Sequence, residues 1–331
     1  MVKTATRAKP GLTWQAFPKQ GIFLVTFAEV DEVLFGGAAG PGKTEALLIY
    51  ALKRRLDHPG SSGLFIRRTY AQLTKEGGAI PMSHELYGGL ATWNAELRKW
   101  TFPNGSVQEF GHCQEESDKY NYQGAQYLDL CFDELTQFTE SMYTYIAFSR
   151  SRNVKEGLGT QLRAATNPGG IGHKWVKKRF VDVAAPYTIY EETMPHPVTG
   201  LALTMTRAFV PANVYDNPLI LEHDPKYILY LQQLPENERR ALLEGRWDLF
   251  EGQAFDEWDP SLHVVQPFQV PVEWPRWYAA DYGYDAPWCC LWFTKDMTLW
   301  KEEQIPRYYC YYEMYKAGLP AHYQALRIKE F

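Results

Sequence analysis

The stretch that decides the fold is Val33–Leu48, VLFGGAAGPGKTEALL. It begins with an apolar, strand-like run, continues into a glycine-rich segment and ends in residues that suit a helix. The segment matches G-x-x-x-x-G-K-[ST] at every fixed position, a pattern typical of a phosphate-binding loop. The predicted loop residues are Gly37, Ala38, Ala39, Gly40, Pro41, Gly42, Lys43 and Thr44. The alternative is a glycine-rich turn that matches by chance, and the flanking strand and helix patterns argue against it.

The chemistry expected of this loop follows from its residue types. Residues without bulk let backbone N–H groups converge on phosphate oxygens at the start of a helix. Lys43 can place a positive charge on the β- and γ-phosphates, and the Thr44 hydroxyl can bind Mg²⁺. The loop therefore predicts a nucleoside triphosphate and Mg²⁺ as cofactors.

Composition places the chain among ordinary globular proteins. Its 331 residues are 45% hydrophobic and 22% charged, and the formal net charge is −5. The length suggests two domains. Because the balance of charge is negative, any contact with nucleic acid must come from local basic patches. The five cysteines form no C-x-x-C pair, which argues against a zinc ribbon and favours a reducing compartment.

Nothing in the sequence has the pattern of a targeting or membrane segment. No run of about 18 apolar residues occurs, and no apolar segment directly follows the basic N-terminus. We therefore expect a soluble intracellular protein with no membrane contact.

Strands and helices alternate through residues 1–250, which predicts an α/β fold with a parallel sheet. Predicted strands after the loop are Gly63–Arg67, Tyr127–Phe132, Leu162–Thr166 and Thr204–Val210. Predicted helices are Thr44–Leu56, Thr139–Arg150, His173–Val183, Pro225–Gln233 and Glu236–Glu244. We therefore predict a P-loop NTPase domain of the ASCE type over residues 1–250.

Prolines mark a change of composition, and we predict a linker over residues 251–275. Beyond it, Trp277–Asp281, Trp288–Thr294 and Thr298–Ile305 are predicted strands, with a helix from near Leu319. Asp281 ends an apolar strand and is a candidate metal ligand, although a carboxylate at a strand end is structural more often than catalytic. A two-metal nuclease needs several such carboxylates.

A pair of carboxylates, Asp133 and Glu134, follows the apolar run of a predicted buried strand. In a parallel sheet this strand end lies at the same edge as the phosphate loop. Asp133 would then hold Mg²⁺, directly or through water, and Glu134 would polarise the attacking water. The alternative is a solvated acidic turn.

Thr166 and Asn167 end the next predicted strand and could sense the γ-phosphate, although an ordinary turn before Pro168 explains them equally well.

Phosphoryl transfer is also faster when a cation stabilises the negative charge that develops in the transition state. The candidates are Arg150 and Arg152, after the helix that follows Glu134, and Arg67 and Arg68, at the end of a strand. For each arginine singly, surface charge is the more common explanation.

Cations crowd the predicted helix His173–Val183. Lys174, Lys177 and Lys178 share one helix face by i, i+3, i+4 spacing. Such a face could follow DNA phosphates and make binding dependent on salt. A solvated helix face is almost as good an explanation.

Together these motifs resemble the large subunit of phage terminases, the motors that package DNA into capsids. Pro18-Lys19-Gln20 is similar to the family's adenine-side glutamine motif, Val33–Thr44 to its phosphate loop, Gly124–Phe138 to its acidic strand and Thr166-Asn167-Pro168 to its coupling motif. Glu244–Trp247 and Glu251–Phe255 resemble the stretch that leads out of the ATPase, and Asp281-Tyr282-Gly283 resembles the first acidic motif of the RNase H-like nuclease. The resemblance covers nearly the whole chain.

The resemblance implies a motor that hydrolyses ATP to move double-stranded DNA, working in the host cytoplasm. Gln20 would lie on the adenine side, Lys43 and Glu134 would be catalytic, and Thr166 and Asn167 would couple hydrolysis to movement. The implied partners are duplex DNA, a small terminase subunit and the portal protein, with the chains forming a homo-oligomeric ring on the portal.

Two departures from the family pattern change these expectations. Some terminases have a trans-acting arginine before the acidic strand, and Lys119–Gln123 contains none, so Arg150 and Arg152 are taken as substitutes. The chain ends at Phe331, before the family's further acidic ligands. We therefore expect residues 276–331 to form a partial RNase H-like domain, whose nuclease site would need Mg²⁺ or Mn²⁺, with little or no cleavage by this chain.

Two other functions fit the same residues. One is another DNA-directed ATPase, such as a helicase or recombination motor, which would unwind a forked duplex directionally. The other is a non-catalytic remnant, which would bind ATP tightly and release no phosphate.

Overall fold

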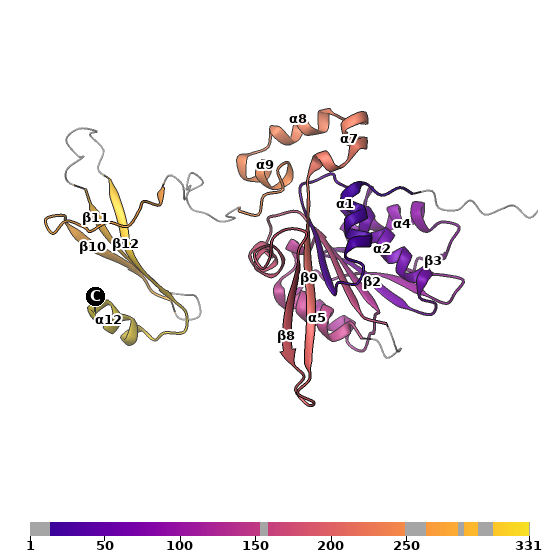
Figure 1. Ribbon diagram of the computed structural model, residues 1–331, viewed down its shortest axis with the longest axis horizontal. Helices are drawn as coiled ribbons and strands as arrows, with labels where there is room; N and C mark the ends of the chain where they lie inside the picture. The colour runs from indigo at the N-terminus through magenta and orange to yellow at the C-terminus, as the bar shows by residue number, and fades with distance from the viewer. Residues whose placement is uncertain (1–13, 153–157, 249–262, 284–287, 297–306, 331) are drawn as a thin grey trace, which may run out of the picture. The chain divides into compact units, whose positions relative to one another are not determined.

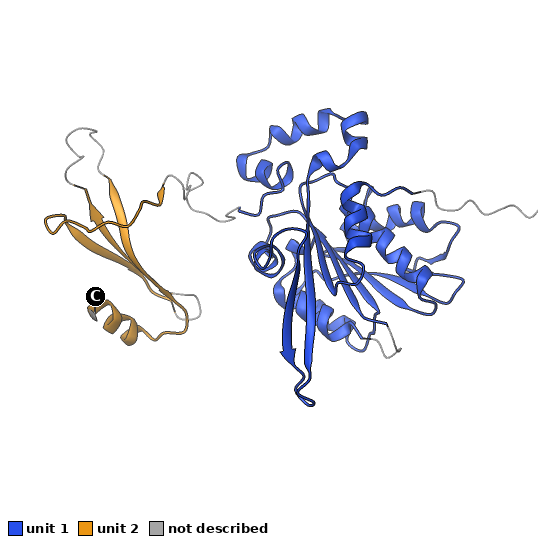
Figure 2. Ribbon diagram, in the orientation of Figure 1, with its two compact units in different colours: residues 1–253 blue, residues 254–331 orange. Residues whose placement is uncertain are grey.

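The computed structural model describes residues 14–152, 158–248, 263–283, 288–296 and 307–330. The chain divides into two compact units, Met1–Gln253 and Ala254–Phe331 (Figure 2). The division falls at the start of the stretch for which a linker is predicted. Among the described residues, no helix is long and apolar enough to cross a membrane.

The first unit is built on a nine-stranded sheet in the order β3-β4-β5-β2-β6-β7-β1-β9-β8 (Figure 1). The six strands from β5 to β9 in this order are parallel to one another. They are β5 (Val107–His112), β2 (Ser62–Arg67), β6 (Asp129–Asp133), β7 (Gln161–Thr166), β1 (Glu32–Gly37) and β9 (Ala202–Ala212). At the edges, β3 (Thr92–Asn94), β4 (Lys99–Thr101) and β8 (Ile189–Pro195) pair antiparallel.

The strand order confirms the predicted α/β fold. β1 precedes the glycine-rich loop and β6 ends in the carboxylate pair, and β7 lies between these two strands. This intervening strand is the arrangement that the ASCE type of P-loop NTPase has. Both motifs therefore lie at the same edge of the sheet without being on adjacent strands.

Helices cover both faces of this sheet (Figure 1). The helices of the first unit are α1 (Pro18–Gly21), α2 (Lys43–Asp57), α3 (Tyr70–Thr74), α4 (Ala79–Tyr87), α5 (Glu140–Arg150), α6 (His173–Val176), α7 (Pro218–His223), α8 (Lys226–Gln232) and α9 (Glu236–Leu242). Short π-helical segments, Ile22–Thr26 and Lys177–Val181, follow α1 and α6. The predicted helix His173–Val183 is therefore α6 together with a π-helical segment.

Two cores follow from the alternation of side chains along each strand. Val33 and Phe35 of β1 are buried in the core that includes residues of α2 and α4. Leu34, between them, is buried in the other core, with residues of α5 and α6. Because helices cover both faces of the parallel strands, side chains on both faces are buried, and the strands have nearly continuous apolar runs in the sequence.

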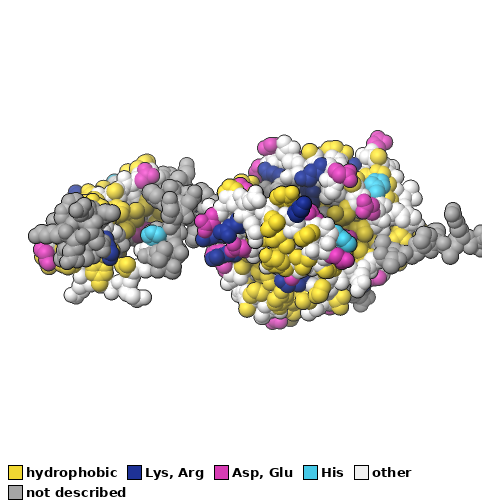
Figure 3. Space-filling view, turned by 90° about the horizontal axis from the view of Figure 1, so that it is seen from above, with side chains coloured by type: hydrophobic (Ala, Val, Ile, Leu, Met, Phe, Trp, Pro, Cys, Tyr) yellow, Lys and Arg dark blue, Asp and Glu magenta, His cyan; other side chains and the backbone are white. Residues whose placement is uncertain are grey.

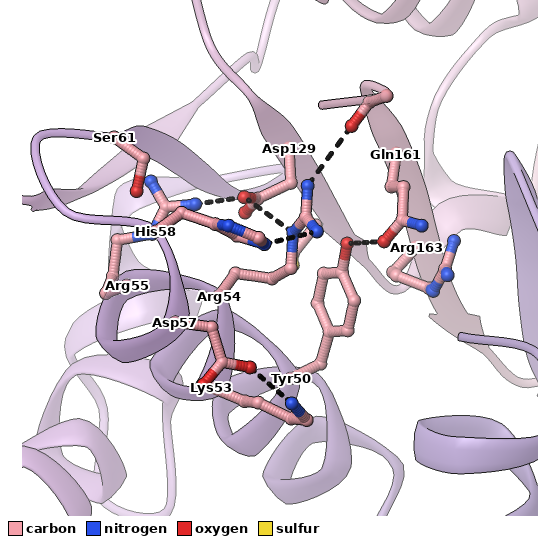
Figure 4. A network of polar contacts seen from close by, with 12 residues as sticks. Tyr50, Lys53, Arg54, Arg55, Asp57, His58, Ser61, Asp129, Gln161 and Arg163 are labelled. Atoms are coloured by element: carbon pink, nitrogen blue, oxygen red, sulfur yellow. Dashed lines mark hydrogen bonds and ion pairs between the residues drawn. The ribbon is translucent and has the colours of Figure 1, made fainter. Parts of the chain in front are cut away.

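A buried polar network lies at the amino ends of β6 and β7, at the opposite edge from the loop (Figure 4). Asp129 is fully buried and forms an ion pair with Arg55, and Arg54 Nε lies 3.6 Å from the same carboxylate. Arg163 is also fully buried, and its guanidinium donates to backbone carbonyls such as that of Val30 at 2.9 Å. Burial raises the pKa of Asp129, while the neighbouring arginines act in the opposite direction.

The second unit is a three-stranded antiparallel sheet, β10 (Arg276–Asp281), β11 (Trp288–Lys295) and β12 (Tyr308–Lys316), with helix α12 (Ala321–Glu330). Alternate residues of β11, such as Trp288 and Trp292, are buried in a small core. Two of the predicted strands are thus confirmed. The third, Thr298–Ile305, lies outside the described residues.

Candidate active site

The glycine-rich loop joins β1 to α2 at the carboxyl end of the parallel strands (Figure 1). Gly37 and Gly42 have φ of 141° and 78°, values that favour glycine. A Cβ atom on Gly37 would lie 2.1 Å from the carbonyl oxygen of Ala212, so a side chain there would push the loop away from β9. Gly42 is the N-cap of α2, and the positive end of this helix therefore points at a place suited to an anion.

Lys43 is buried against the loop that it belongs to. Its ammonium donates to the carbonyl oxygen of Ala38 at 2.5 Å and to Oδ1 of Asn167 at 2.6 Å. Burial lowers the pKa of Lys43 to about 8, although the carboxylates of Glu134 and Asp133 act in the opposite direction. The positive charge is thus fixed between the loop and the end of β7.

Asp133 and Thr44 meet at the end of β6. The Thr44 hydroxyl lies 3.0 Å from Asp133 Oδ2, and Arg67 Nε donates to the same oxygen at 2.7 Å. Asp133 is 1% exposed. A hydroxyl and a carboxylate this close are hard oxygen donors of the kind that Mg²⁺ takes, usually together with phosphates and water. The two predicted magnesium residues therefore fit one ion.

Glu134 is held in a left-handed backbone conformation, with φ of 58° and ψ of 50°. Such a conformation costs about 1–3 kcal/mol for a residue other than glycine and occurs often at functional sites. Burial raises the pKa of Glu134, and the neighbouring Asp133 carboxylate adds to the rise, while Lys43 and Arg67 oppose it. Glu134 lines a cavity of about 290 Å³. The carboxylate is thus partly withdrawn from water beside the lysine.

Thr166 and Asn167 join the loop to the turn after Glu134. On one side, Asn167 accepts the hydrogen bond from Lys43. On the other, the Thr136 hydroxyl donates to the Asn167 carbonyl at 2.9 Å and lies 2.7 Å from the Thr166 hydroxyl. A chain of hydrogen bonds therefore connects the phosphate loop with the acidic turn. Sequence reasoning missed Thr136, which has no motif of its own.

The helices α7–α9 also contact the loop, and nothing in the sequence analysis predicted this. Ala39 N–H donates to the carbonyl oxygen of Leu242 at 2.7 Å, and Asn217 Nδ2 donates to that of Gly40 at 2.7 Å. Gly245 has φ of 68°, and a Cβ atom there would lie 2.6 Å from Ala38 N. In the sequence, the only indication that this segment lies close to the loop is the position of Gly245 directly after a predicted helix.

Gln20, the predicted adenine-side residue, is 1% exposed. Its Oε1 accepts from Phe17 N–H at 2.9 Å, and its Nε2 donates to the Gly42 carbonyl at 3.0 Å. A cavity of about 520 Å³ lies nearby, lined by Trp14, Gln15, Ala16, Phe17, Pro18, Glu45, Pro218 and Leu219. The structure thus brings Gln20 to the loop but leaves it out of the cavity lining.

Arg150 and Arg152 are not brought to this site. Tyr127, which precedes β6, donates its N–H to the Arg150 carbonyl at 3.0 Å, and an Arg152 side-chain nitrogen lies 3.4 Å from the Ala125 carbonyl. β6 runs about 13 Å from that end to Asp133. Neither arginine therefore reaches the loop of its own chain, and their role stays a prediction for a neighbouring subunit. Arg67, another of the candidates, does reach the site.

The remaining predicted residues lie away from the loop. Lys174 and Lys178 are exposed, and Lys177 pairs with Asp182 at 2.6 Å. Asp281 is exposed at the end of β10, in the second unit. Across the described parts of the chain, no three His, Cys, Asp or Glu side chains form a group able to hold a metal.

Comparison with known proteins gives one family and several solved structures. The family model described as "Terminase large subunit, T4likevirus-type, N-terminal" matches residues 34–258. No curated protein matches. The large terminase of a thermophilic bacteriophage is 17% identical, with a TM-score of 0.56 over 96% of this chain and 74% of that one.

The same thermophilic-phage terminase is also similar in two nucleotide complexes, each 17% identical to this chain. The complex with ADP has a TM-score of 0.55 over 96% of this chain and 74% of that one. The complex with ATP-γ-S has a TM-score of 0.52 over 95% and 72%. At this identity the likeness shows a shared fold. The family model covers more than half of the sequence, and the chain therefore belongs to the T4likevirus-type family of phage terminase large subunits.

Proposed function

We propose that this chain is the ATP-hydrolysing subunit of a motor that moves double-stranded DNA into a viral capsid. The observation that carries the proposal is the meeting of Lys43, Thr44, Asp133 and Glu134 at one edge of the sheet. Support also comes from the similar thermophilic-phage terminase, which has been solved with ADP and with ATP-γ-S.

The proposed chemistry assigns one task to each residue. Backbone N–H groups of Gly37–Thr44 and the Lys43 ammonium bind the phosphates, and Thr44 and Asp133 hold Mg²⁺, which neutralises phosphate charge when bound. Arg67 orients the Asp133 carboxylate. Glu134 positions the attacking water and accepts its proton, and the burial that raises its pKa makes it a stronger base.

Movement is proposed to follow from the hydrogen-bond chain through Asn167 and Thr166. Loss of the γ-phosphate changes the surroundings of Lys43, and Asn167 passes that change to Thr136 and the acidic turn. The contacts that Leu242 and Asn217 make with the loop extend this hydrogen-bond chain to the helices α7–α9.

We propose Asp281 as a ligand of Mg²⁺ or Mn²⁺ in an RNase H-like second unit.

Hydrolysis of ATP by the wild-type chain, with and without duplex DNA, is the experiment that tests the function. We expect phosphate release that rises when duplex DNA is added, because a packaging motor couples the two. Failure to release phosphate under either condition would contradict the proposal and favour a nucleotide-binding remnant. Directional unwinding of a forked duplex would instead favour a helicase.

Lys174 and Lys178 are the proposed DNA contacts, because both are exposed and both belong to the same cationic segment. Figure 3 shows basic and acidic side chains interspersed on one face of the first unit. On this face, DNA would therefore have to bind to a small local group of lysines and arginines. We expect the double variant Lys174→Ala/Lys178→Ala to weaken binding to duplexes of any sequence. The slope of log K against log salt should fall by about 2.

The matched control is Lys75→Ala, an exposed lysine elsewhere in the first unit. It should leave both the affinity and the salt slope unchanged. Binding measured by fluorescence anisotropy from low to high salt gives both quantities. An unchanged slope in the double variant would mean that DNA binds another surface.

The proposed partners also include the small terminase subunit and the portal protein, with several copies of this chain forming a ring.

A further inference from the structure

His173, the first residue of α6, is buried between two segments that are far apart in the sequence. It is 4% exposed. Its Nδ1 accepts from the Gly169 N–H at 3.0 Å, and its Nε2 lies 3.2 Å from the carbonyl oxygen of Trp247. A neutral imidazole whose Nδ1 accepts has its proton on Nε2, so Nε2 donates to that carbonyl. The ring therefore connects Gly169, in the turn that follows Asn167, to Trp247.

Trp247 is held largely by ring contacts, and His173 supplies one of them. The imidazole stacks on the indole, with ring centroids 5.5 Å apart and an angle of 21° between the planes. Phe209 contacts the indole edge to face at 6.0 Å, and a Cβ atom on Gly36 would lie 2.9 Å from it. Among the described residues, the indole N–H has no hydrogen-bond partner. The orientation of Trp247 therefore depends on the rings packed against it.

The start of α6 is also fixed to the turn that follows Glu134. Gly172 N–H donates to the Thr136 carbonyl at 2.7 Å, and a Cβ atom on Gly172 would lie 2.4 Å from the Phe138 carbonyl oxygen. Trp175 Nε1 donates to the same Phe138 carbonyl at 2.9 Å. The position of His173 is therefore set by the acidic turn and by the turn after Asn167 together.

Trp247 belongs to the segment through which the chain leaves the first unit. It follows the end of α9 at Leu242, and the first unit ends at Gln253. The first strand of the second unit begins at Arg276. A contact that holds Trp247 therefore holds the root of the segment that leads to the second unit.

We propose that His173 is a positioning residue through which the turn after Asn167 holds Trp247, so that a change at the nucleotide site reaches the segment leading to the second unit. The proposal rests on the proposed function, in which Asn167 responds to loss of the γ-phosphate. Contiguous hydrogen bonds and packed side chains can carry such coupling between two sites. This route leaves the turn through Gly169 and ends at Trp247, and it does not use the contacts of Leu242 and Asn217 with the loop.

Hydrogen exchange of the amides of residues 246–248, measured with ADP and with ATP-γ-S, tests the inference. In the wild type we expect the two nucleotides to give rates that differ about fivefold, because one hydrogen bond contributes about that factor to a local equilibrium. In His173→Asn, the shorter side chain can still accept from Gly169 N–H but does not reach the Trp247 carbonyl. We expect the difference at residues 246–248 to disappear in this variant, while residues 37–44 keep their response to nucleotide.

His173→Gln is the complementary variant, because its Nε2 can still donate to the Trp247 carbonyl. We expect it to restore much of the difference that His173→Asn loses. His84→Asn is the matched control, since His84 is an exposed histidine of α4 whose ring lies 5.3 Å from that of Trp93. It should exchange as the wild type does. The KM for ATP should stay near the wild-type value in all three variants, because neither histidine belongs to the phosphate loop.

A difference between nucleotides that persists at residues 246–248 in His173→Asn would overturn the inference. Its absence in the wild type while residues 37–44 respond would overturn it as well. An equal loss in His173→Asn and His173→Gln, with lower melting temperatures in both, would also overturn it, because the ring would then serve packing only.

If residues 37–44 respond to neither nucleotide, the proposed function fails by itself, and Gly170→Ala then decides the inference. A Cβ atom on Gly170 would lie 2.8 Å from the Thr136 carbonyl oxygen, so this variant displaces the turn without nucleotide. Altered exchange at residues 246–248 that disappears when His173→Asn is added supports the inference. Unaltered exchange in Gly170→Ala overturns it.

Discussion

Replacing Glu134 with glutamine is expected to lower the rate of ATP hydrolysis by at least about 100-fold while leaving ATP binding intact. Glutamine has the same size, so the cavity that Glu134 lines keeps its shape. Its neutral amide cannot accept the proton of the attacking water. Phosphate release at saturating ATP measures the first effect, and equilibrium binding of ATP measures the second.

Two further variants define what this result means. Glu140→Gln, in the exposed first turn of α5, is the matched control and should hydrolyse ATP at the wild-type rate. Lys43→Ala should lose binding as well as turnover, because the ammonium held by Ala38 and Asn167 is the charge meant for the phosphates. Turnover of Glu134→Gln within a few-fold of wild type would remove Glu134 from the proposed mechanism.

The loop and the acidic strand could be predicted because their chemistry requires particular residues at short spacing. The glycines of Gly37–Thr44 have backbone angles that favour glycine, and Asp133 and Glu134 end an apolar strand. Contacts made by main-chain atoms have no such signature. The hydrogen bond from Ala39 to Leu242 joins two backbones far apart in the sequence, so the cover that α9 forms over the loop could not be predicted.

Arg150 and Arg152 show how nearness in the sequence misleads. They follow Glu134 by one helix, which suggested that they lie near it. The eleven residues of α5 span about 16 Å and run back along the sheet, so its end lies at the amino end of β6. Arg67 ends a strand adjacent to β6 and therefore meets Asp133.

The edge strand β8 escaped prediction for a different reason. β8 (Ile189–Pro195) pairs only with β9 in the sheet, and all of its residues are exposed or half-buried. A strand without a buried face needs no apolar run, and its sequence then has no periodic signal. The predicted strand Thr204–Val210 contains the buried residues 207–210 of β9, while the exposed residues Ala202 and Leu203 at its start were missed.

Replacing Asp129 with alanine is expected to destabilise the first unit by about 3–5 kcal/mol, because Arg55 would remain buried without the carboxylate that pairs with it. At about 2–4 °C per kcal/mol, the melting temperature should fall by about 6–20 °C. Asp129→Asn keeps the size and removes the charge, so it should lose most of the same stability. Chemical denaturation of both variants measures the change in the free energy of unfolding.

Asp57→Ala provides the matched control on α2. Its ion pair with Lys53 is exposed, with 47% and 58% of the two side chains accessible, and exposed pairs contribute at most about 1 kcal/mol. The phosphate loop lies at the other edge of the sheet from Asp129, so folded Asp129→Asn should hydrolyse ATP with the wild-type KM. Equal stability of the Asp129 and Asp57 variants would show that water or another group neutralises the buried arginines. A changed KM in the folded variant would instead mean that the network at the amino ends also positions the loop.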